Sequence, residues 1–141
     1  MFSATFRYAL ISLLEIASAA DGVNTATIAD RHRLPATYLA NVLRDLRRLG
    51  LIVSQKGHRG GHQLAVTPEQ IDLLSLQEGL AGAAAPDDPG PDHPALGAEV
   101  WLQSIERRWR QELASTNLLD VQRLVDAAVD QSLAQPEAHV R

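Results

Sequence analysis

The sequence predicts a mainly α-helical protein with a small β-wing, organised as a winged helix-turn-helix followed by a long dimerisation helix. Three observations lead to this fold class. Residues 34–49 form an amphipathic helix rich in arginine, and residues 51–66 form two short β-runs joined by a glycine-rich basic turn. Residues 97–115 then carry a sustained apolar stripe at helical spacing.

Length and composition are those of an ordinary globular protein. The 141 residues suffice for one compact domain with an appendage, and 45% of them are hydrophobic and 21% charged. No apolar run approaches the roughly 20 residues that a membrane-spanning helix needs. Arg7 and Glu15 interrupt the apolar N-terminal stretch, which lacks the basic start and cleavage site of a signal peptide. We therefore expect a cytoplasmic protein without a membrane partner.

The two halves of the chain differ in charge. Residues 1–66 contain eight Lys and Arg against four Asp and Glu, whereas residues 67–141 contain five against thirteen. The net charge of −4 therefore hides a basic half and an acidic half. This division indicates a polyanion-binding face kept apart from a second role. Acidic residues that only solubilise the second half would explain its charge, but not the cations gathered over residues 44–59.

The chain contains no cysteine, which excludes disulfides, thiolate nucleophiles and cysteine-ligated zinc or iron–sulfur clusters. His58, His62 and His93 are scattered and lack supporting carboxylates, so they make a weak metal signal. The glycine run at 57–61 lies between strands, whereas a phosphate-binding loop precedes a helix. Nothing in the sequence resembles a nucleophile beside its base. We therefore predict neither an enzyme nor a metal or cofactor site.

Two helices open the chain. Residues 3–20 place apolar side chains at three- and four-residue spacing, and the Asp-Gly pair at 21–22 ends this helix. A short second helix is predicted over residues 25–33, with Thr25 as its N-cap. Residues 32–34 make the turn to the next helix.

The third helix carries the basic face. Pro35 suits its first turn, because the missing N–H needs no partner there, and Gly50 ends it. Strands at 51–55 and 63–66 then flank residues 56–62, which are too rich in glycine for regular structure. The buried face of the helix is predicted to hold Leu39, Val42, Leu43, Leu46 and Leu49, and the opposite face Thr37, Asn41, Arg44 and Arg48.

The second half begins with a short helix over residues 71–81. The next segment holds four of the seven prolines and three aspartates, so it cannot pack a core and we expect a mobile loop. Helices follow over 97–115 and 118–133, the second with a capping box formed by Asn117 and Asp120. The apolar face of this last helix is predicted to hold Leu118, Val121, Leu124, Val125 and Ala128. The predicted regions are the winged helix-turn-helix at 1–81, the Pro-rich loop at 82–96, the dimerisation and C-terminal helices at 97–134, and a polar tail at 135–141.

The exposed face of the third helix has the chemistry of a DNA reader. Cations that neutralise phosphates release condensed counterions, and a helix fits the major groove. Arg44 and Arg48 can donate to phosphate or guanine, and Asn41 can pair with adenine. Thr37 can contact a phosphate or a thymine methyl. A solvated charged face is the alternative for this helix alone, but the basic hairpin behind it favours DNA.

Two further segments can contact phosphates. At the hairpin tip, Lys56, His58 and Arg59 lie among glycines that allow close approach to the backbone or entry into the minor groove. An ordinary exposed turn is the alternative there. At the N-terminus, Ser3 and Arg7 begin a helix whose backbone N–H groups can hold a phosphate, although helix capping explains the serine equally well.

The helix at 97–115 offers a surface for dimerisation. Two DNA-reading modules related by a dyad can read half-sites about one helical turn apart. The alternative is that the apolar stripe packs only on its own chain. The predicted interface residues are Trp101, Leu102, Ile105, Trp109 and Leu113.

These elements together resemble the Rrf2 family of bacterial winged-helix regulators. Each motif is weak alone, and the specificity of the match comes from their collinear order over nearly the whole chain. The matching elements are Arg7-Tyr8-Ala9 in the first helix, Ala29-Asp30-Arg31 in the second, Tyr38-Leu39, Leu43 and the run Leu46 to Ile52 in and after the third, and Lys56-Gly57, Gly60-Gly61 and Leu64 in the wing.

The resemblance implies a homodimeric transcription regulator that acts on a pseudo-palindromic operator, a repressor by family habit. It also implies a recognition helix in the major groove, read out by Thr37, Tyr38 and Asn41, and Lys56 as the wing cation in the minor groove. The full set predicted to contact double-stranded DNA is Ser3, Arg7, Tyr8, Thr25, Thr37, Tyr38, Asn41, Arg44, Arg48, Lys56, His58 and Arg59.

The chain departs from the family pattern in two ways. Many members hold an iron–sulfur cluster on three cysteines in the loop before the dimerisation helix, and residues 82–96 contain none. The chain thus resembles cluster-free members, which respond to a protein partner or a small-molecule effector. Ala40 stands where a Glu that accepts from cytosine is common, so a different target sequence is expected. The rival interpretation is a winged-helix module that binds protein and has lost DNA binding, which the acidic second half would fit.

Overall fold

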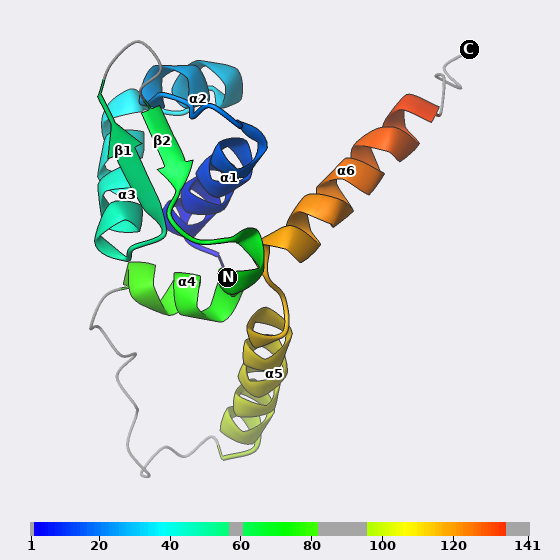
Figure 1. Ribbon diagram of the computed structural model, residues 1–141. Coiled ribbons are helices and arrows are strands. Elements are labelled where there is room, and N and C mark those ends of the chain that lie inside the picture. The colour runs from blue at the N-terminus through cyan, green and yellow to red at the C-terminus, as the bar shows by residue number, and fades with distance from the viewer. Residues whose placement is uncertain (1, 57–60, 82–95, 135–141) are drawn as a thin grey trace.

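The computed structural model describes residues 2–56, 61–81 and 96–134. These residues form six α-helices, one 3-10 helix and a two-stranded antiparallel sheet, so the predicted mainly helical class with a small β-wing is confirmed (Figure 1). The elements are α1 (Ala4–Ser18), α2 (Thr25–His32), α3 (Ala36–Arg48), β1 (Ile52–Gln55), β2 (Gly61–Leu64), η1 (Pro68–Gln70), α4 (Leu73–Ala81), α5 (Leu96–Ala114) and α6 (Leu118–Ala134).

One hydrophobic core joins the first three helices. Leu13 of α1, Ile28 of α2 and Leu43 of α3 are almost completely buried in it. Burying a side chain of this kind stabilises a fold by about 1.5–3 kcal/mol. The predicted buried face of α3 is confirmed for Leu39, Val42, Leu43 and Leu46, whereas Leu49 is only partly buried.

Helix ends follow local capping chemistry. The prediction that Thr25 caps α2 is wrong by one residue: Asn24 is the N-cap, and its Oδ1 accepts from the Thr27 N–H at 2.8 Å. Thr25 is the first helical residue, and its hydroxyl is engaged elsewhere, by His62. The capping box of α6 is confirmed, because Asn117 and Asp120 each accept from the backbone N–H of the other.

The second wing strand lies two residues closer to the wing tip than predicted. It runs from Gly61 to Leu64 and pairs with β1 so that Ile52 lies opposite Leu64 and Gln55 opposite Gly61. His62 and Val23 exchange both backbone hydrogen bonds as an antiparallel bridge. This bridge explains why β2 already begins at Gly61, within the segment expected to lack regular structure. Gly61 permits this approach at φ +150°, since a Cβ there would lie 2.8 Å from backbone atoms of Val23.

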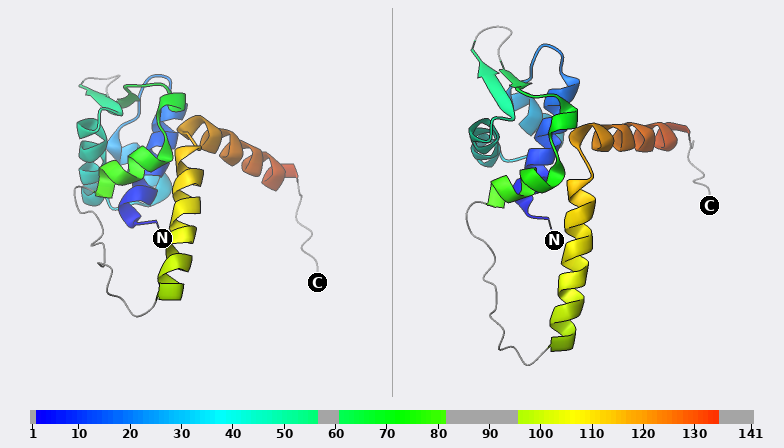
Figure 2. Two further views of the ribbon diagram at one scale, coloured as in Figure 1. Left: turned by 90° about the horizontal axis from the view of Figure 1, so that it is seen from below. Right: turned by 60° about the horizontal axis from the view of Figure 1, so that its bottom comes forward.

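The C-terminal helices are tied to the body at their junction. Leu113 of α5 and Leu118 of α6 belong to the same core as the first three helices. The Leu118 N–H donates to the Ile71 carbonyl at 2.9 Å, and the Trp109 ring lies edge-on to Phe2 at 5.0 Å. From this junction the two helices leave the body in different directions (Figure 2).

Two predicted regions lie wholly or mostly outside the described residues. They are the polar tail at 135–141 and the Pro-rich loop at 82–96, of which only Leu96 is described, as the first residue of α5. Within the described part of the chain, no helix is both long and apolar enough to cross a bilayer.

Candidate nucleic-acid interface

The solvent side of α3 presents the four polar side chains that the sequence placed there. Thr37, Asn41, Arg44 and Arg48 are all exposed and lie opposite the buried leucines; we call them the α3 face. Arg48 pairs with Asp45 at 3.6 Å, a distance and an exposure at which the pair contributes little. Among the described residues Arg44 makes no ion pair. Both guanidinium groups are therefore available to an anion.

Tyr38 anchors one side of α3 to α1. Its hydroxyl lies within hydrogen-bond distance of the Thr5 hydroxyl, and its ring lies edge-on to Tyr8, with centroids 5.3 Å apart at 85°. This is a favourable aromatic geometry. The structure thus brings together Tyr8 and Tyr38, both predicted to contact DNA, and gives each a packing role as well.

Arg47 anchors the other side of α3 to the wing, and the sequence prediction missed it. Its Nη1 donates to the Ser54 Oγ of β1 at 3.0 Å. Ser54 lies seven residues further along the chain, beyond the helix end, so no helical spacing reveals the contact. Since Tyr38 and Arg47 project on opposite sides of the α3 face, this face is held between α1 and the wing.

A buried histidine continues this contact into the body. The Nδ1 of His62 lies 2.9 Å from the Ser54 Oγ, and its Nε2 lies 3.0 Å from the Thr25 Oγ1 of α2. His62 is buried, and burial followed by the nearby Arg47 charge lowers its pKa below the ordinary value of about 6.5. The imidazole is therefore neutral near pH 7. The predicted DNA contact Thr25 faces this histidine.

The remaining predicted contacts are distributed over the wing and the N-terminus. Lys56 is exposed and follows β1 directly, while His58 and Arg59 lie outside the described residues. Ser3 caps α1, with its Oγ accepting from the Phe6 N–H at 3.1 Å, and Arg7 is exposed one turn later. Arg31 of α2 is neutralised by Glu15 at 2.6 Å, so that cation belongs to a contact between helices.

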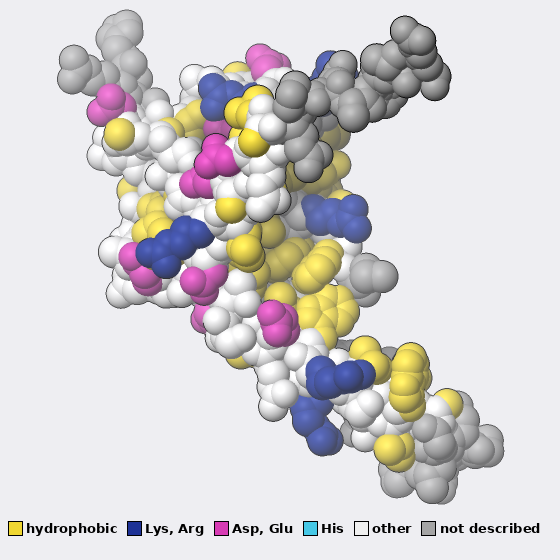
Figure 3. Space-filling model, turned by 90° about the vertical axis from the view of Figure 1, so that its right-hand side faces the viewer, with side chains coloured by type: hydrophobic (Ala, Val, Ile, Leu, Met, Phe, Trp, Pro, Cys, Tyr) yellow, Lys and Arg dark blue, Asp and Glu magenta, His cyan; other side chains and the backbone are white. Residues whose placement is uncertain are grey.

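The predicted dimer surface divides into two parts. Leu113 is buried in the core of its own chain, and Trp109 is partly buried against it, so their packing needs no partner. By contrast, Trp101 is 62% exposed and Leu102 is 53% exposed. Figure 3 shows hydrophobic side chains along the lower arm, which is α5, and again in the middle of the same face. The apolar stripe therefore serves its own chain near the junction and is uncovered toward the start of α5.

The last helix exposes a second apolar stripe that the sequence analysis did not assign to any interface. Val125, Val129 and Leu133 recur four residues apart on α6 and are all exposed, Leu133 by 78%, and Leu124 is exposed beside Val125. The helix points away from the body in all the ribbon views (Figures 1 and 2). The spacing alone predicted an apolar face, but could not say that the chain itself leaves it uncovered.

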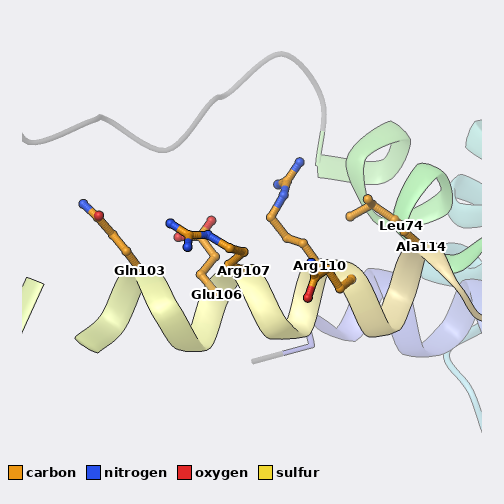
Figure 4. A pocket seen from close by; sticks show the side chains of 7 residues that line it. Leu74, Gln103, Glu106, Arg107, Arg110 and Ala114 are labelled. Atoms are coloured by element: carbon orange, nitrogen blue, oxygen red, sulfur yellow. The ribbon is translucent and has the colours of Figure 1, made fainter. Parts of the chain in front are cut away.

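A shallow groove of about 480 Å³ lies along α5 where this helix faces Leu74 of α4, and Figure 4 shows the side chains that line it. Arg107 and Arg110 line it together with Leu74. Arg110 forms an ion pair with Glu78 of α4 at 2.5 Å, which links α5 to the body. Within the described ranges, no group of three His, Cys, Asp or Glu residues is arranged to hold a metal ion.

Comparison with known proteins agrees with this geometry. The Rrf2 family model, described as an iron-dependent transcriptional regulator, matches residues 2–124. Protein rrf2 of Nitratidesulfovibrio vulgaris is 30% identical over 126 residues, covering 83% of each chain. The HTH-type transcriptional regulator CymR of Bacillus subtilis is 29% identical over 122 residues, covering 85% of this chain and 88% of CymR.

Solved structures give the same result. The structure of CymR, titled the global cysteine regulator of B. subtilis, superposes with a TM-score of 0.75 at 28% identity, covering 88% of this chain and 97% of that one. IscR of T. potens has a TM-score of 0.72 at 24% identity, with 99% and 93% coverage, and supports the fold alone. The family and CymR are described as transcriptional regulators, not as enzymes.

Proposed function

Because this chain belongs to the Rrf2 family of transcriptional regulators, we propose that it is a sequence-specific, homodimeric DNA-binding repressor acting on a pseudo-palindromic operator in the cytoplasm. The resemblance drawn from the sequence is confirmed by these matches. The observation that carries the proposal is the α3 face, where two available guanidinium groups stand beside Asn41 and Thr37 on a helix held from both sides. Such a helix fits the major groove.

The two arginines of this face should make DNA affinity depend measurably on salt concentration. Each phosphate that an arginine neutralises releases counterions, so affinity falls with salt in proportion to the number of contacts. The wing adds Lys56, and the start of α1 adds Arg7, both exposed. We expect double-stranded DNA to bind across these elements, with the α3 face reading bases and the others contacting the backbone.

Selection of duplexes from a random-sequence pool, followed by fluorescence anisotropy over a salt series, tests this proposal. We expect one enriched palindromic motif, bound more tightly than bulk DNA and with a steep negative salt slope. Repression is tested by transcription in vitro from a promoter that carries the motif. A protein that enriches no motif and shows no salt-dependent shift would instead fit the rival protein-binding module.

The dimer is supported by apolar surface that the chain leaves uncovered. The start of α5 and the stripe of α6 together expose Trp101, Leu102, Val129 and Leu133. Exposed apolar patches of this kind on a soluble protein usually mark contacts with partners. A second copy would cover the same patches on both chains and place two α3 faces on one side of a duplex.

We further propose that the regulator functions without an iron–sulfur cluster, although its family is described as iron-dependent. The residues present do not fit such a group, because the whole sequence contains no cysteine thiolate. Protein purified without oxygen should show no absorption band beyond that of its aromatic residues. A visible band that iron chelation abolishes would contradict this proposal.

A further inference from the structure

We propose that His62 is a positioning residue for the DNA interface: its imidazole fixes the wing against α2 and α3, so that Lys56 and the α3 face can engage one duplex together. This inference rests on the proposed function and adds a residue that touches no DNA. It is carried by three contacts: Ser54 of β1, Thr25 of α2 and, through Ser54, Arg47 of α3.

Besides the two backbone hydrogen bonds between Val23 and His62, few side chains hold the wing in place. Ile52 is the buried side chain of β1, and the three residues after it are exposed. His62 is the buried side chain of β2, and its partner across the strands is Ser54, one residue from the outer end of β1. A two-stranded hairpin is marginally stable by itself. The backbone bonds to Val23 hold β2 alone, so the ties from the wing to α2 and α3 come from the polar contacts of the His62 and Ser54 side chains.

Hydrogen-bond accounting favours an imidazole at this position. The Ser54 Oγ accepts from Arg47, so its hydroxyl proton can go to one ring nitrogen while the other ring nitrogen donates to the Thr25 hydroxyl. In the reverse tautomer the Ser54 Oγ accepts from both Arg47 and the ring, and its own hydroxyl proton then needs another acceptor. Either way, a neutral ring offers one donor and one acceptor at opposite ends. A hydrocarbon side chain would leave both hydroxyls without this partner.

The charge state of the ring affects the same contacts. From the elements packed against His62, the facing groups are Thr25, Ser54, the Val23 backbone and Arg47, of which only Arg47 is charged. A proton on the ring would place a second positive charge beside the guanidinium that holds the wing. Acidification should therefore loosen the wing through His62, in addition to any effect on exposed histidines.

Binding of the selected duplex by His62→Phe, His62→Gln and Ser54→Ala tests the inference. We expect His62→Phe and Ser54→Ala each to lower affinity about tenfold, with the salt slope unchanged, because no phosphate contact is lost. The double variant should bind no more weakly than either single one, since both break the same connection. Arg44→Ala is the matched contact variant, and it should reduce the slope by about one.

Two readouts separate positioning from general destabilisation. The chain contains no cysteine, so spin labels introduced by Gln55→Cys and Ala40→Cys report the distance from the wing to α3 without further changes. This distance distribution should broaden in His62→Phe, measured below its melting transition. For the pH comparison, both proteins carry His58→Gln. Between about pH 8 and pH 5.5, the protein that also carries His62→Gln should lose less DNA affinity than the protein that keeps His62.

The outcomes distinguish this inference from the proposed function. If His62→Phe does not fold, Ser54→Ala, which leaves the buried ring in place, decides the question. Folded variants with wild-type affinity and an unchanged label distance would overturn the role of His62 while leaving DNA binding intact. A salt slope reduced by one in His62→Phe would also overturn it, by indicating a phosphate contact. A wild-type protein that binds no DNA would overturn both.

Discussion

The hydroxyl oxygens of Thr5 and Tyr38 lie 2.5 Å apart and join the first turn of α1 to the first turn of α3. The Tyr38 ring also packs edge-on against Tyr8, so the start of α3 is fixed by one polar and one aromatic contact. Tyr38 therefore has a defined position beside the α3 face, and the two contacts can be removed separately.

Tyr38→Phe should lower the free energy of unfolding by about 0.5–1.5 kcal/mol, because it removes the hydrogen bond and keeps the ring. Tyr38→Ala should cost about 0.5–1.5 kcal/mol more, since the aromatic pair is lost as well. Urea unfolding of both variants measures this difference. Equal losses in the two variants would mean that the ring contact does not contribute.

Arg44→Ala should weaken DNA binding and reduce the salt slope by about one, because it removes one exposed guanidinium from the α3 face. Arg48→Ala should have a similar effect, slightly reduced by the weak pair with Asp45. Arg31→Ala is the matched control, since Glu15 already neutralises that arginine. Anisotropy over a salt series measures all three, and a slope that changes only in the control would refute the assignment of the face.

The free energy of unfolding should depend on pH through His62. Burial and Arg47 lower its pKa in the folded state, so well above pH 6.5 the ring is neutral in both states and contributes no pH dependence. As the pH falls below 6.5, the unfolded chain takes up a proton that the folded chain binds poorly, and stability declines by at most about 1.4 kcal/mol per pH unit.

Unfolding experiments with wild type and His62→Gln at several pH values measure this term. The difference in free energy of unfolding between the two proteins should be constant above about pH 6.5 and shrink below it, because the glutamine variant lacks the titrating ring. If this difference stays constant down to about pH 5, groups other than His62 cause the loss of stability in acid.

Gly61→Ala should destabilise the protein by about 3 kcal/mol, since a Cβ there would lie 2.8 Å from the backbone of Val23 and the chain is at φ +150°. Gly50→Ala is the matched comparison. Its φ is +75°, but nothing lies within 4 Å of the added Cβ, so only the conformational cost of about 1 kcal/mol remains. Thermal unfolding of the pair isolates the steric part, and equal melting temperatures would contradict it.

Replacing Val129 and Leu133 together by serine should shift the protein from dimer to monomer, because both side chains are exposed on one side of α6 and need a partner to bury them. Arg123→Ser, which lies toward the other side of the same helix, should leave the mass unchanged. Sedimentation equilibrium gives the mass directly. A double variant that remains dimeric would leave the start of α5, with Trp101 and Leu102, as the interface.

Local sequence patterns predicted the helices and their buried faces well. They could not predict contacts between residues far apart in the sequence. The spacing of Leu39, Val42, Leu43 and Leu46 fixes which side of α3 is buried, and hence which polar residues face solvent. The role of His62 could not be read in the same way. Its partners Thr25 and Ser54 lie 37 and 8 residues away, and its glycine-rich surroundings resemble an exposed turn until Val23 is placed beside it.

The C-terminal half illustrates the second limit. The sequence predicted an apolar stripe on each of its helices but could not tell which part the chain covers by itself. Trp109 and Leu113 contact the core because the junction of α5 and α6 is tied to Ile71 by a backbone hydrogen bond, whereas Trp101 and Leu133 lie beyond the reach of the body. Only the tertiary arrangement separates the two groups.

The shared core of Leu113, Leu118 and the leucines of α3 has a mechanical consequence. The junction between α5 and α6 packs into the same close-packed interior as α3, and such interiors deform little. A displacement of the α5–α6 junction would therefore carry α3 with it as a rigid body. In the proposed dimer, a signal that moves the two junctions apart would change which spacing of half-sites fits, without reshaping either α3 face.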